Sequence, residues 1–490
     1  RRAAVKRGLT CCQLVRAGVN VWSIIGATPQ YCRRHIADDT TYGCPTTGES
    51  RGDRTTGHVR VAHKVTFMAR KLRTRMAITA GRMASATSRI AGRGEGMVVG
   101  GRVMLKLAPD AIADLANGRV AALVSATNGK TSTTRLLANA VEQLGPVVTA
   151  ATGANMTSGV VTTLASGPPD ATAVLEVDEA YLPMVTAATK PRVILLGNLS
   201  RDQLDRMNEV AMTARKWRAM LAEHPEVTVV ANADDPVVTF AAEQAPRVVW
   251  VGGGQVWTAD SSVCPECGTL LTRTEHDWNC TGCGRKRPET SWELQWTDGV
   301  GTAVSRLGQE LDLSGLQLPG RFNASNATLA LAVAEQLGLG LEESVRRMCQ
   351  VQAVSGRYAI VDVGALRIRL LLAKNPAGWT ELIDVMPGAP TPVIVSINSN
   401  AADGRDPSWL WDVPFEKLRG RTVIATGDRR RDLAVRLLHA QVDHVVIADP
   451  YSPHAPLPPE ARALEVIDNA ATYTAFHELR TRAQREASND

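Results

Sequence analysis

Residues Thr127 to Thr133, T-N-G-K-T-S-T, combine a glycine, a lysine and hydroxyl side chains in one short segment. Gly129 would let backbone amides approach phosphate oxygens, Lys130 could reach the outer phosphates, and the Thr131 hydroxyl could hold Mg²⁺. The segment departs from the general phosphate-loop pattern, because Val124 stands where the first glycine is expected. We interpret Thr127, Asn128, Gly129, Lys130, Thr131 and Ser132 as a nucleotide site.

Four cysteines form a second chemical pattern, in which Cys264 and Cys267 are followed after twelve residues by Cys280 and Cys283. Two C-x-x-C knuckles at this spacing can supply four thiolates to one tetrahedral Zn²⁺. Four protein ligands leave no position for substrate, so the predicted zinc site is structural. Disulfides are the alternative, and His276 between the knuckles could replace one ligand.

The elements around the T-N-G-K-T segment predict how it is positioned. An apolar run over Arg119 to Ala126 is typical of a buried strand, and Ser132 to Leu144 has helical periodicity. The segment therefore lies in a strand-to-helix turn. Further strand-like runs, separated by helical stretches, indicate a parallel sheet covered on both faces; they are Ala173 to Val177, Arg192 to Leu196 and Val227 to Ala231.

A second alternating block begins near residue 356 and predicts a Rossmann-like C-terminal α/β domain. Its expected strands are Pro392 to Ile397, Arg421 to Ala425 and His444 to Ile447. The expected domains are a basic extension without structure over 1–75, a helical segment over 76–117, a central domain over 118–355 with a zinc ribbon at 262–288, and a C-terminal domain over 356–490. Within the helical segment we expect a helix over Ala77 to Ile90 and a flexible glycine-rich joint over Gly92 to Gly101.

Composition bounds the class of protein. The 490 residues are 44% hydrophobic and 21% charged, which excludes a disordered or fibrous chain, and no apolar run approaches the length of a membrane span. Residues 1–75 hold 15 Lys or Arg against 4 Asp or Glu, so the remainder is acidic with 40 against 45. An acidic body argues against a large nucleic-acid footprint, and no nucleic-acid partner is expected.

The order of several motifs resembles the Mur ligases and their folylpolyglutamate synthase relatives, which activate a carboxylate as an acyl phosphate with ATP. Besides T-N-G-K-T, the matching segments are L-E-V-D-E at 175–179, N-A-D-D-P at 232–236 and G-R-F-N-A-S-N-A at 320–327. The resemblance implies that Glu176 binds Mg²⁺, that Asn323 and Asn326 lie near the adenine, and that Arg357 approaches the nucleotide phosphates. Gln203 and Met207 stand where that family has histidines, which puts its second metal site in doubt.

The cysteine ribbon, the segment D-Q-L-D-R at 202–206, L-A-K-N-P-A-G at 372–378 and N-A-A-D-G-R-D-P at 400–407 narrow the resemblance to the MurT family. These are the ligase subunits of lipid II isoglutaminyl synthase. The resemblance implies amidation of the D-isoglutamyl α-carboxylate of the lipid II stem peptide, with ammonia supplied by a glutaminase partner of the GatD type. It also implies work in the cytoplasm, at the inner face of the cytoplasmic membrane.

Three candidate catalytic residues follow from this resemblance. Asp406 would complete a Cys-His-Asp triad of the partner, although a turn-capping role fits the sequence as well, and Asp403 and Asp412 are rivals. Lys374 and Asn375 would face the acyl phosphate. Trp409 and Trp411 are expected on one face of a strand, in the core or in the interface with the partner. Cys349 is interpreted as a buried apolar side chain, so no glutaminase is expected in this chain.

Two other functions remain open from the sequence. One is a single-chain Mur or folylpolyglutamate-type ligase that adds an amino acid and needs no partner. The other is a zinc-ribbon ATP-binding protein that acts on nucleic acid, for which the basic residues 1–75 would be functional.

Overall fold

The computed structural model describes residues 55–90, 96–150, 153–201, 210–254, 257–274, 277–351 and 358–488. The chain divides into two compact units, residues 1–66 and 67–490. The second unit contains every predicted site residue. Within the described residues, no helix is long and apolar enough to cross a bilayer.

Within the described residues, three helices precede strand β1: α5 (Thr55–Ile90), α6 (Met97–Leu107) and α7 (Ala111–Ala116). Helix α5 begins 22 residues before the helix expected at Ala77, so the prediction of no structure is wrong for residues 55–75. Over residues 70–90, where the side chains are described, the buried face of α5 consists of small residues, Thr74, Ala77, Gly81, Ser85 and Ser88.

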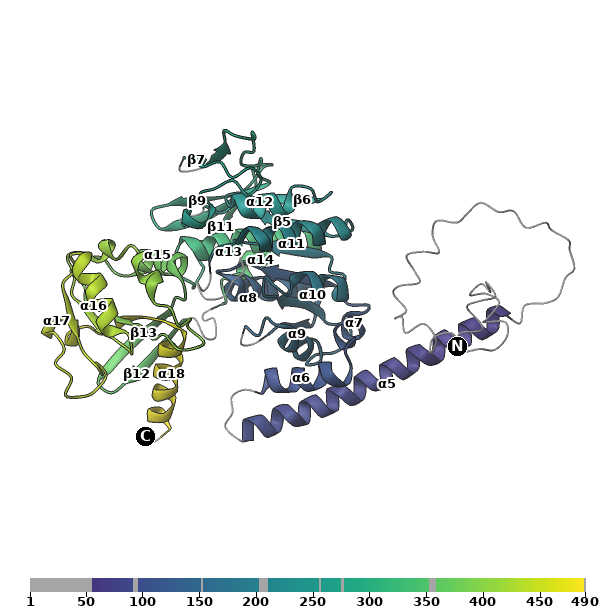
Figure 1. Cartoon of the computed structure of the whole chain (residues 1–490), viewed down its shortest axis with the longest axis horizontal. Coiled ribbons are helices and arrows are strands. Elements are labelled where there is room, and N and C mark those ends of the chain that lie inside the picture. Colours follow the sequence, from purple (N-terminus) through teal and green to yellow (C-terminus); the bar gives the residue numbers. More distant parts are fainter. Residues whose placement is uncertain are drawn as a thin grey trace, which may run out of the picture. The chain divides into compact units, whose positions relative to one another are not determined.

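The expected glycine-rich joint is also wrong in its second half, because Gly100 and Gly101 lie inside α6. A Cβ on Gly100 would collide with the Ser85 hydroxyl of α5, and a Cβ on Gly101 with the backbone of Ser158 in α9 (Thr157–Leu164). These glycines therefore serve close helix packing instead of flexibility. Figure 1 shows α6 alongside the C-terminal half of α5.

The central domain is built on a nine-stranded sheet in the order β11-β10-β9-β6-β5-β4-β1-β3-β2. The six neighbouring strands β6, β5, β4, β1, β3 and β2 pair in parallel. The antiparallel hairpins β9–β10 and β10–β11 extend the β6 edge of the sheet. The strands are β1 (Ala121–Ser125), β2 (Val147–Val148), β3 (Thr172–Glu176), β4 (Val193–Leu196), β5 (Thr228–Asn232), β6 (Val248–Gly252), β9 (Trp292–Thr297), β10 (Val300–Ser305) and β11 (Glu310–Asp312).

Both faces of this sheet are buried, as the continuous apolar runs predict. Along β1, Leu123 packs into one core and Val124 into the other. The remaining helices of the domain are α8 (Lys130–Val141), α10 (Leu182–Thr189), α11 (Val210–Glu223), α12 (Pro236–Ala242), α13 (Arg321–Leu337) and α14 (Leu341–Met348), with short 3-10 helices at Glu142–Leu144 and Ala259–Ser261. Helices α8, α13 and α14 pack together on the Val124 side.

The C-terminal domain has a six-stranded sheet in the order β12-β13-β17-β14-β15-β16, parallel except for the β12–β13 hairpin. Its strands are β12 (Tyr358–Val363), β13 (Leu366–Leu372), β14 (Val393–Ser396), β15 (Val423–Thr426), β16 (His444–Val446) and β17 (Ile467–Ala471). Its helices are α15 (Pro376–Val385), α16 (Arg430–His439), α17 (Pro459–Arg462) and α18 (Tyr473–Ala487), with 3-10 turns at Ser408–Trp411 and Phe415–Leu418. The two expected α/β sheets are confirmed.

The packing of α6 on α9 gives a stability prediction. Gly101→Ala should lower the free energy of unfolding by about 1 to 3 kcal/mol, because its Cβ would overlap backbone atoms of Ser158 that cannot rotate away. Gly388→Ala is the control, since no atom lies within 4 Å of a Cβ built there. Denaturant unfolding measures both variants, and equal stabilities would contradict the packing role of Gly101.

Candidate functional site

The turn from β1 to α8 carries residues 127–132, here called the loop 127–132. Gly129 has φ 82°, in the left-handed region that favours glycine, and α8 begins at the next residue. A Cβ at Gly129 would lie 2.7 Å from the Asn326 side chain of α13. Both the backbone conformation and the close approach of Asn326 therefore require glycine at this position.

The segment that follows β4 holds the first two residues of the loop 127–132 in place. The Asn128 amide donates to the Asn198 side-chain oxygen at 2.9 Å, and the Asn198 side-chain NH₂ donates to the Asn128 carbonyl at 2.9 Å. Thr127 and Asn128 each also bond to Ser200. The loop is thus held in place by polar contacts from a neighbouring strand end, which the sequence did not identify.

Lys130 is buried and lies inside this loop. Its ammonium donates to the Ala126 and Thr127 carbonyls and forms an ion pair with Glu179 at 2.9 Å. A phosphate that approaches Lys130 must compete with the Glu179 carboxylate for the ammonium. Glu179 lies in the L-E-V-D-E segment, but its pairing with Lys130 depends on the fold and left no signal in the sequence.

Thr131 and Glu176 meet beside Gly153, as a shared magnesium site would require. The Thr131 hydroxyl and the Glu176 Oε2 lie 3.1 and 3.3 Å from the position of a Cβ on Gly153. Glu176 is buried at the end of β3, and its Oε1 accepts a hydrogen bond from Asn155 at 3.1 Å. A hydroxyl and a buried carboxylate are oxygen ligands that suit Mg²⁺.

Two small cavities lie between the loop 127–132, α13 and α15. Asn128, Gly129 and Glu381 line both cavities, Asn326 lines one of them, and Asn323, Ser132 and Lys374 line the other. The structure thus brings the predicted nucleotide residues of the central domain to one place with the start of α15. Asn323 bonds to the Pro319 carbonyl at 2.7 Å and accepts from Asn326 at 3.4 Å.

Asn375 has a structural role that the sequence did not predict. It is the N-cap of α15, and its side-chain oxygen accepts a hydrogen bond from the Gly378 amide at 2.9 Å. The neighbouring Lys374 ammonium lies 5.0 Å from the centre of the Tyr473 ring and borders one cavity. The role of Lys374 at a reacting group stays a prediction.

Glu381 is a site residue that the sequence analysis missed, because a single glutamate on a helix carries no signal by itself. Its half-buried carboxyl faces the two cavities from α15. Burial, with a smaller contribution from the negative charge of Asp384, raises the pKa of Glu381 to about 8. At neutral pH this carboxyl is mainly protonated, so it can donate a hydrogen bond within the site.

Asp406 is exposed and accepts a hydrogen bond from the Ser408 amide at 2.9 Å, the turn-capping contact weighed above. The rival Asp403 is buried, and its carboxylate accepts bonds from Asn400 and Thr474. The rival Asp412 forms an ion pair with Arg201 at 3.5 Å. Asp406 is thus better placed than Asp403 to reach a second protein.

The strand expected at the two tryptophans is wrong, because Ser408–Trp411 is a 3-10 turn. Residues two apart on such a turn do not share a face. Trp409 is buried and its ring stacks on Trp379, whereas Trp411 is 55% exposed. Only Trp409 belongs to the core.

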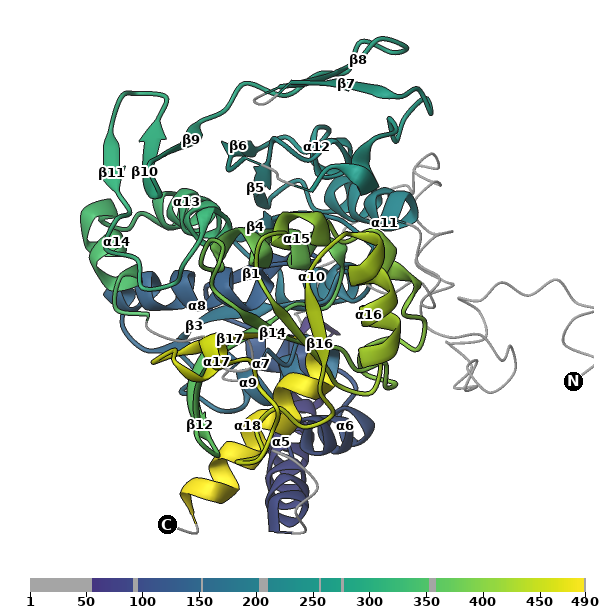
Figure 2. The ribbon, with the colours of Figure 1, turned by 90° about the vertical axis from the view of Figure 1, so that its left-hand side faces the viewer.

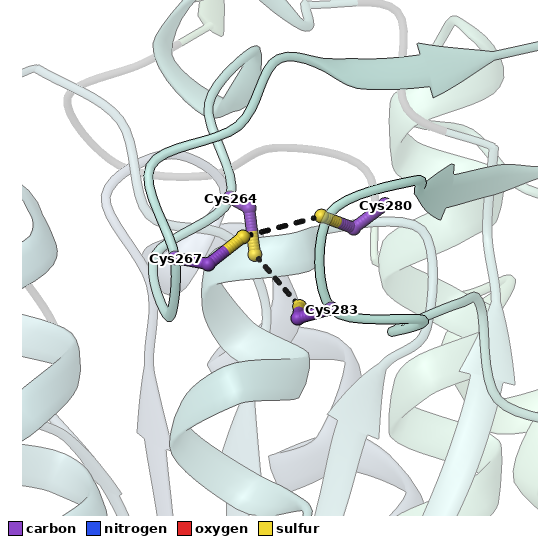
Figure 3. Close-up of side chains that lie close together, drawn as sticks. All are labelled: Cys264, Cys267, Cys280 and Cys283. Atoms are coloured by element: carbon purple, nitrogen blue, oxygen red, sulfur yellow. Dashed lines mark hydrogen bonds between the residues drawn. The ribbon is translucent and has the colours of Figure 1, made fainter.

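The four ribbon cysteines converge, as Figure 3 shows. All their sulfur atoms lie within 4.8 Å of one another, with Cys264 to Cys283 at 3.7 Å and Cys267 to Cys280 at 3.4 Å. Disulfide sulfurs would be about 2.05 Å apart, whereas a tetrahedral zinc with Zn–S bonds of about 2.3 Å separates its ligands by about 3.8 Å. The geometry therefore fits one metal ion and excludes disulfide pairing within this set.

The ribbon consists of β7 (Leu271–Arg273) and β8 (Trp278–Cys280), and its base is joined to the N-A-D-D segment. The Trp278 indole donates to the Ala233 carbonyl at 2.9 Å, and Arg287 pairs with Asp234 at 2.7 Å. Figure 2 shows this hairpin beyond β6 and α12. The cysteine end of the ribbon is also anchored, since Glu266 beside Cys267 pairs with Arg218 of α11 and Arg285 beside Cys283 pairs with Glu243.

An open cleft of about 1200 Å³ lies between the loop 127–132 and the ribbon. Its lining includes Thr127, Glu179 and Arg201, together with Met212 of α11 and Cys267 of the ribbon. A cleft of this size is ample for a peptide or sugar substrate. It adjoins the loop at Thr127.

Several predicted residues lie outside the described ranges. These are Arg357, the segment with Gln203 and Met207, and His276. Their predicted roles stay predictions.

Family models match two parts of the chain. The MurT ligase C-terminal model matches residues 372–476, and the Mur ligase middle domain model matches residues 124–261. A protein of Streptococcus pneumoniae named lipid II isoglutaminyl synthase (glutamine-hydrolyzing) subunit MurT is 32% identical over 396 residues, which cover 75% of this chain and 87% of that protein. The subunit MurT of Staphylococcus aureus strain N315 is 30% identical, with 76% and 89% covered.

Solved structures show the same fold at low identity. A pseudomurein peptide ligase type C from Methanothermus fervidus has a TM-score of 0.58 at 17% identity and covers 76% of this chain and 79% of its own. MurF from Acinetobacter baumannii has a TM-score of 0.54 at 15% identity, with 78% and 80% covered. The predicted fold class, a Mur ligase-type domain followed by a C-terminal α/β domain, is confirmed.

The sulfur geometry predicts the metal content of variants. Cys264→Ser should reduce bound zinc from about one ion per chain to a small fraction, because three thiolates bind far more weakly than four. Cys349→Ser is the matched control, since Cys349 lies at the end of α14, outside the ribbon. Elemental analysis after gel filtration measures the ratio, and full zinc in Cys264→Ser would contradict the assignment.

The raised pKa of Glu381 predicts a pH dependence of stability. A carboxyl whose folded-state pKa is raised disfavours the folded state progressively as pH rises from the unfolded-state pKa, near 4.5, to about 8. Glu381→Gln should therefore be more stable than the wild type at pH 9, by roughly 1 to 3 kcal/mol, and differ little at pH 5. Glu460→Gln is the control, since Glu460 is an exposed glutamate of α17, and denaturant unfolding at both pH values tests the difference. A Glu381→Gln effect that is equal at both pH values would contradict the shift.

Proposed function

The chain belongs to the family of the MurT ligase subunits of lipid II isoglutaminyl synthase, and on this premise we propose that it amidates the lipid II stem peptide. The reaction converts the α-carboxylate of the D-isoglutamyl residue to D-isoglutamine with ATP and ammonia. The observation that supports it most is the convergence of the loop 127–132, Glu176, Asn326 and the start of α15 at one site.

The chemical step is the attack of the stem-peptide carboxylate on the γ-phosphate of ATP, which gives an acyl phosphate and ADP. Thr131 and Glu176 would hold a Mg²⁺ ion, which when bound neutralises charge on the phosphate oxygens. Lys130 stabilises the transferred phosphoryl group after it exchanges Glu179 for phosphate oxygens. Asn323, Asn326 and Arg357 contribute to nucleotide binding.

Ammonia then attacks the acyl carbon and displaces phosphate, which leaves the amide. Lys374 at the cavity edge is the candidate for holding the departing phosphate. Asn375 would position Lys374, because it fixes the adjoining backbone by capping α15. The open cleft beside Thr127 would take the peptide and sugar portion of lipid II. The site thus has separate places for the nucleotide and for the acceptor.

A partner must supply the ammonia. Cys349 is half-buried, and burial raises the pKa of its thiol, which is the opposite of a nucleophilic cysteine. The proposed source is a GatD-type glutaminase subunit, in which exposed Asp406 would orient a histidine. The zinc held by the ribbon is structural in this proposal. The work would take place in the cytoplasm, at the inner membrane face where lipid II is made.

The test is ATP-dependent amidation of purified lipid II by the chain, followed by the mass loss of about one dalton that replaces OH by NH₂. Ammonium should support the reaction without a partner, and glutamine should support it only with the glutaminase subunit. Addition of an amino acid in place of ammonia would refute the proposal.

Asp406→Asn separates the two ammonia sources. The variant should keep the ammonium-dependent rate and lose about 100-fold or more of the glutamine-dependent rate, since it no longer orients the partner's imidazole. Asp412→Asn is the matched control on the same segment and should keep both rates. An equal loss of both rates in Asp406→Asn would contradict a role at the partner.

A further inference from the structure

Helix α5 carries two parallel columns of side chains within its described part. Leu72, Met76, Met83 and Ile90 follow spacings of four, seven and seven residues. At about 100° per residue, these four positions fall within an arc of about 40° on the helix. The apolar column therefore runs straight along one face.

A basic residue precedes each apolar one, so that Lys71, Arg75, Arg82 and Arg89 form a second column with the same spacing. One residue of offset places this column about 100° around the helix from the apolar column. Residues 70–90 contain six Lys or Arg and no Asp or Glu. Arg82 donates to the Ala165 carbonyl at 2.9 Å, and the column as a whole gives the edge of the apolar stripe a positive charge.

The apolar column is exposed on the folded protein. Its four side chains are 60% to 89% exposed, whereas Thr74, Ala77, Gly81, Ser85 and Ser88 form the buried face. Polar contacts fasten that buried side: Thr74 bonds to Asp114 at 2.6 Å, Arg73 to the Leu107 carbonyl at 2.6 Å, and Ser85 to the Gly96 carbonyl at 3.0 Å. The orientation of the exposed face is therefore fixed by packing on α6 and α7.

We propose that this face of α5 binds the surface of an anionic lipid bilayer. A helix that lies in the interface inserts an apolar stripe among the acyl chains and places Lys and Arg at the phosphate level, which matches the two columns. The face would hold the enzyme where a lipid-linked substrate resides. In that respect the inference deepens the proposed function, but the binding itself needs neither ATP nor lipid II.

The test is co-sedimentation of the full 490-residue chain with vesicles that contain no lipid II. Vesicles of phosphatidylglycerol and phosphatidylcholine should bind the chain, pure phosphatidylcholine vesicles should bind it at least tenfold more weakly, and salt should weaken binding to the anionic vesicles. Equal binding to both compositions, or no binding to either, would overturn the proposal.

Paired variants assign the binding to α5 and separate it from the rest of the chain. Arg75→Glu with Arg89→Glu should weaken binding to anionic vesicles by about tenfold or more, and Met76→Ser with Met83→Ser should weaken it by a similar factor. The charge-matched control is Arg135→Glu with Arg431→Glu, and the apolar control is Leu307→Ser with Leu438→Ser; all four of these residues are exposed outside α5. Both controls should bind as the wild type does.

Three further readouts keep the outcomes distinct. Thermal unfolding should be unchanged in the α5 variants, because the replaced side chains are exposed. Ammonium-dependent amidation of a soluble stem-peptide analogue should also be unchanged, so that a failure of the proposed function appears there and not in the vesicle assay. Light scattering measures the oligomeric state of each variant. Unaltered vesicle binding by the α5 variants would overturn the proposal, whether or not their oligomeric state changes.

Discussion

Gly129 lacks a side chain at the point where the chain turns from β1 into α8, and the arrangement of the site depends on that. Its left-handed backbone and the Asn326 side chain occupy the space that a Cβ would need. Since Asn326 belongs to α13, the loop 127–132 is joined there to a helix some 200 residues later in the chain. The same loop borders α15 across the two small cavities, so a single turn brings both domains to the nucleotide residues.

Charge inside this site is balanced before any phosphate arrives. The Lys130 ammonium is neutralised by Glu179 and solvated by two carbonyls, and Glu176 is held by Asn155 beside Thr131. A buried ammonium without such partners would destabilise the fold. In the proposed function, ATP and its metal would therefore enter by exchanging partners with groups already in position, instead of by creating new buried charges. Burial raises the pKa of Glu381 to about 8, so this carboxyl adds less negative charge to the site than an exposed glutamate would.

The sequence was most informative where a residue pattern is compatible with only one kind of structure. Strands buried on both faces appear as continuous apolar runs, so β1, β3, β4 and β5 were located to within two residues, and the C-x-x-C spacing identified the ribbon. Contacts between distant segments left no such trace, as for Asn198 with Asn128, Glu179 with Lys130, and Glu381 at the cavities. Glycines gave the opposite error, because Gly100 and Gly101 resemble a flexible joint in the sequence but allow α6 to pack closely on its neighbours.

We propose that a substrate carboxylate is phosphorylated at this site before ammonia attacks it. Lipid II labelled with ¹⁸O in its D-isoglutamyl α-carboxylate tests this most directly, with the chain, ATP and ammonium, and with phosphate analysed by mass spectrometry. An acyl phosphate intermediate leaves a carboxylate oxygen on phosphorus, so the account predicts one ¹⁸O in each inorganic phosphate released. Amide formation with unlabelled phosphate would contradict it.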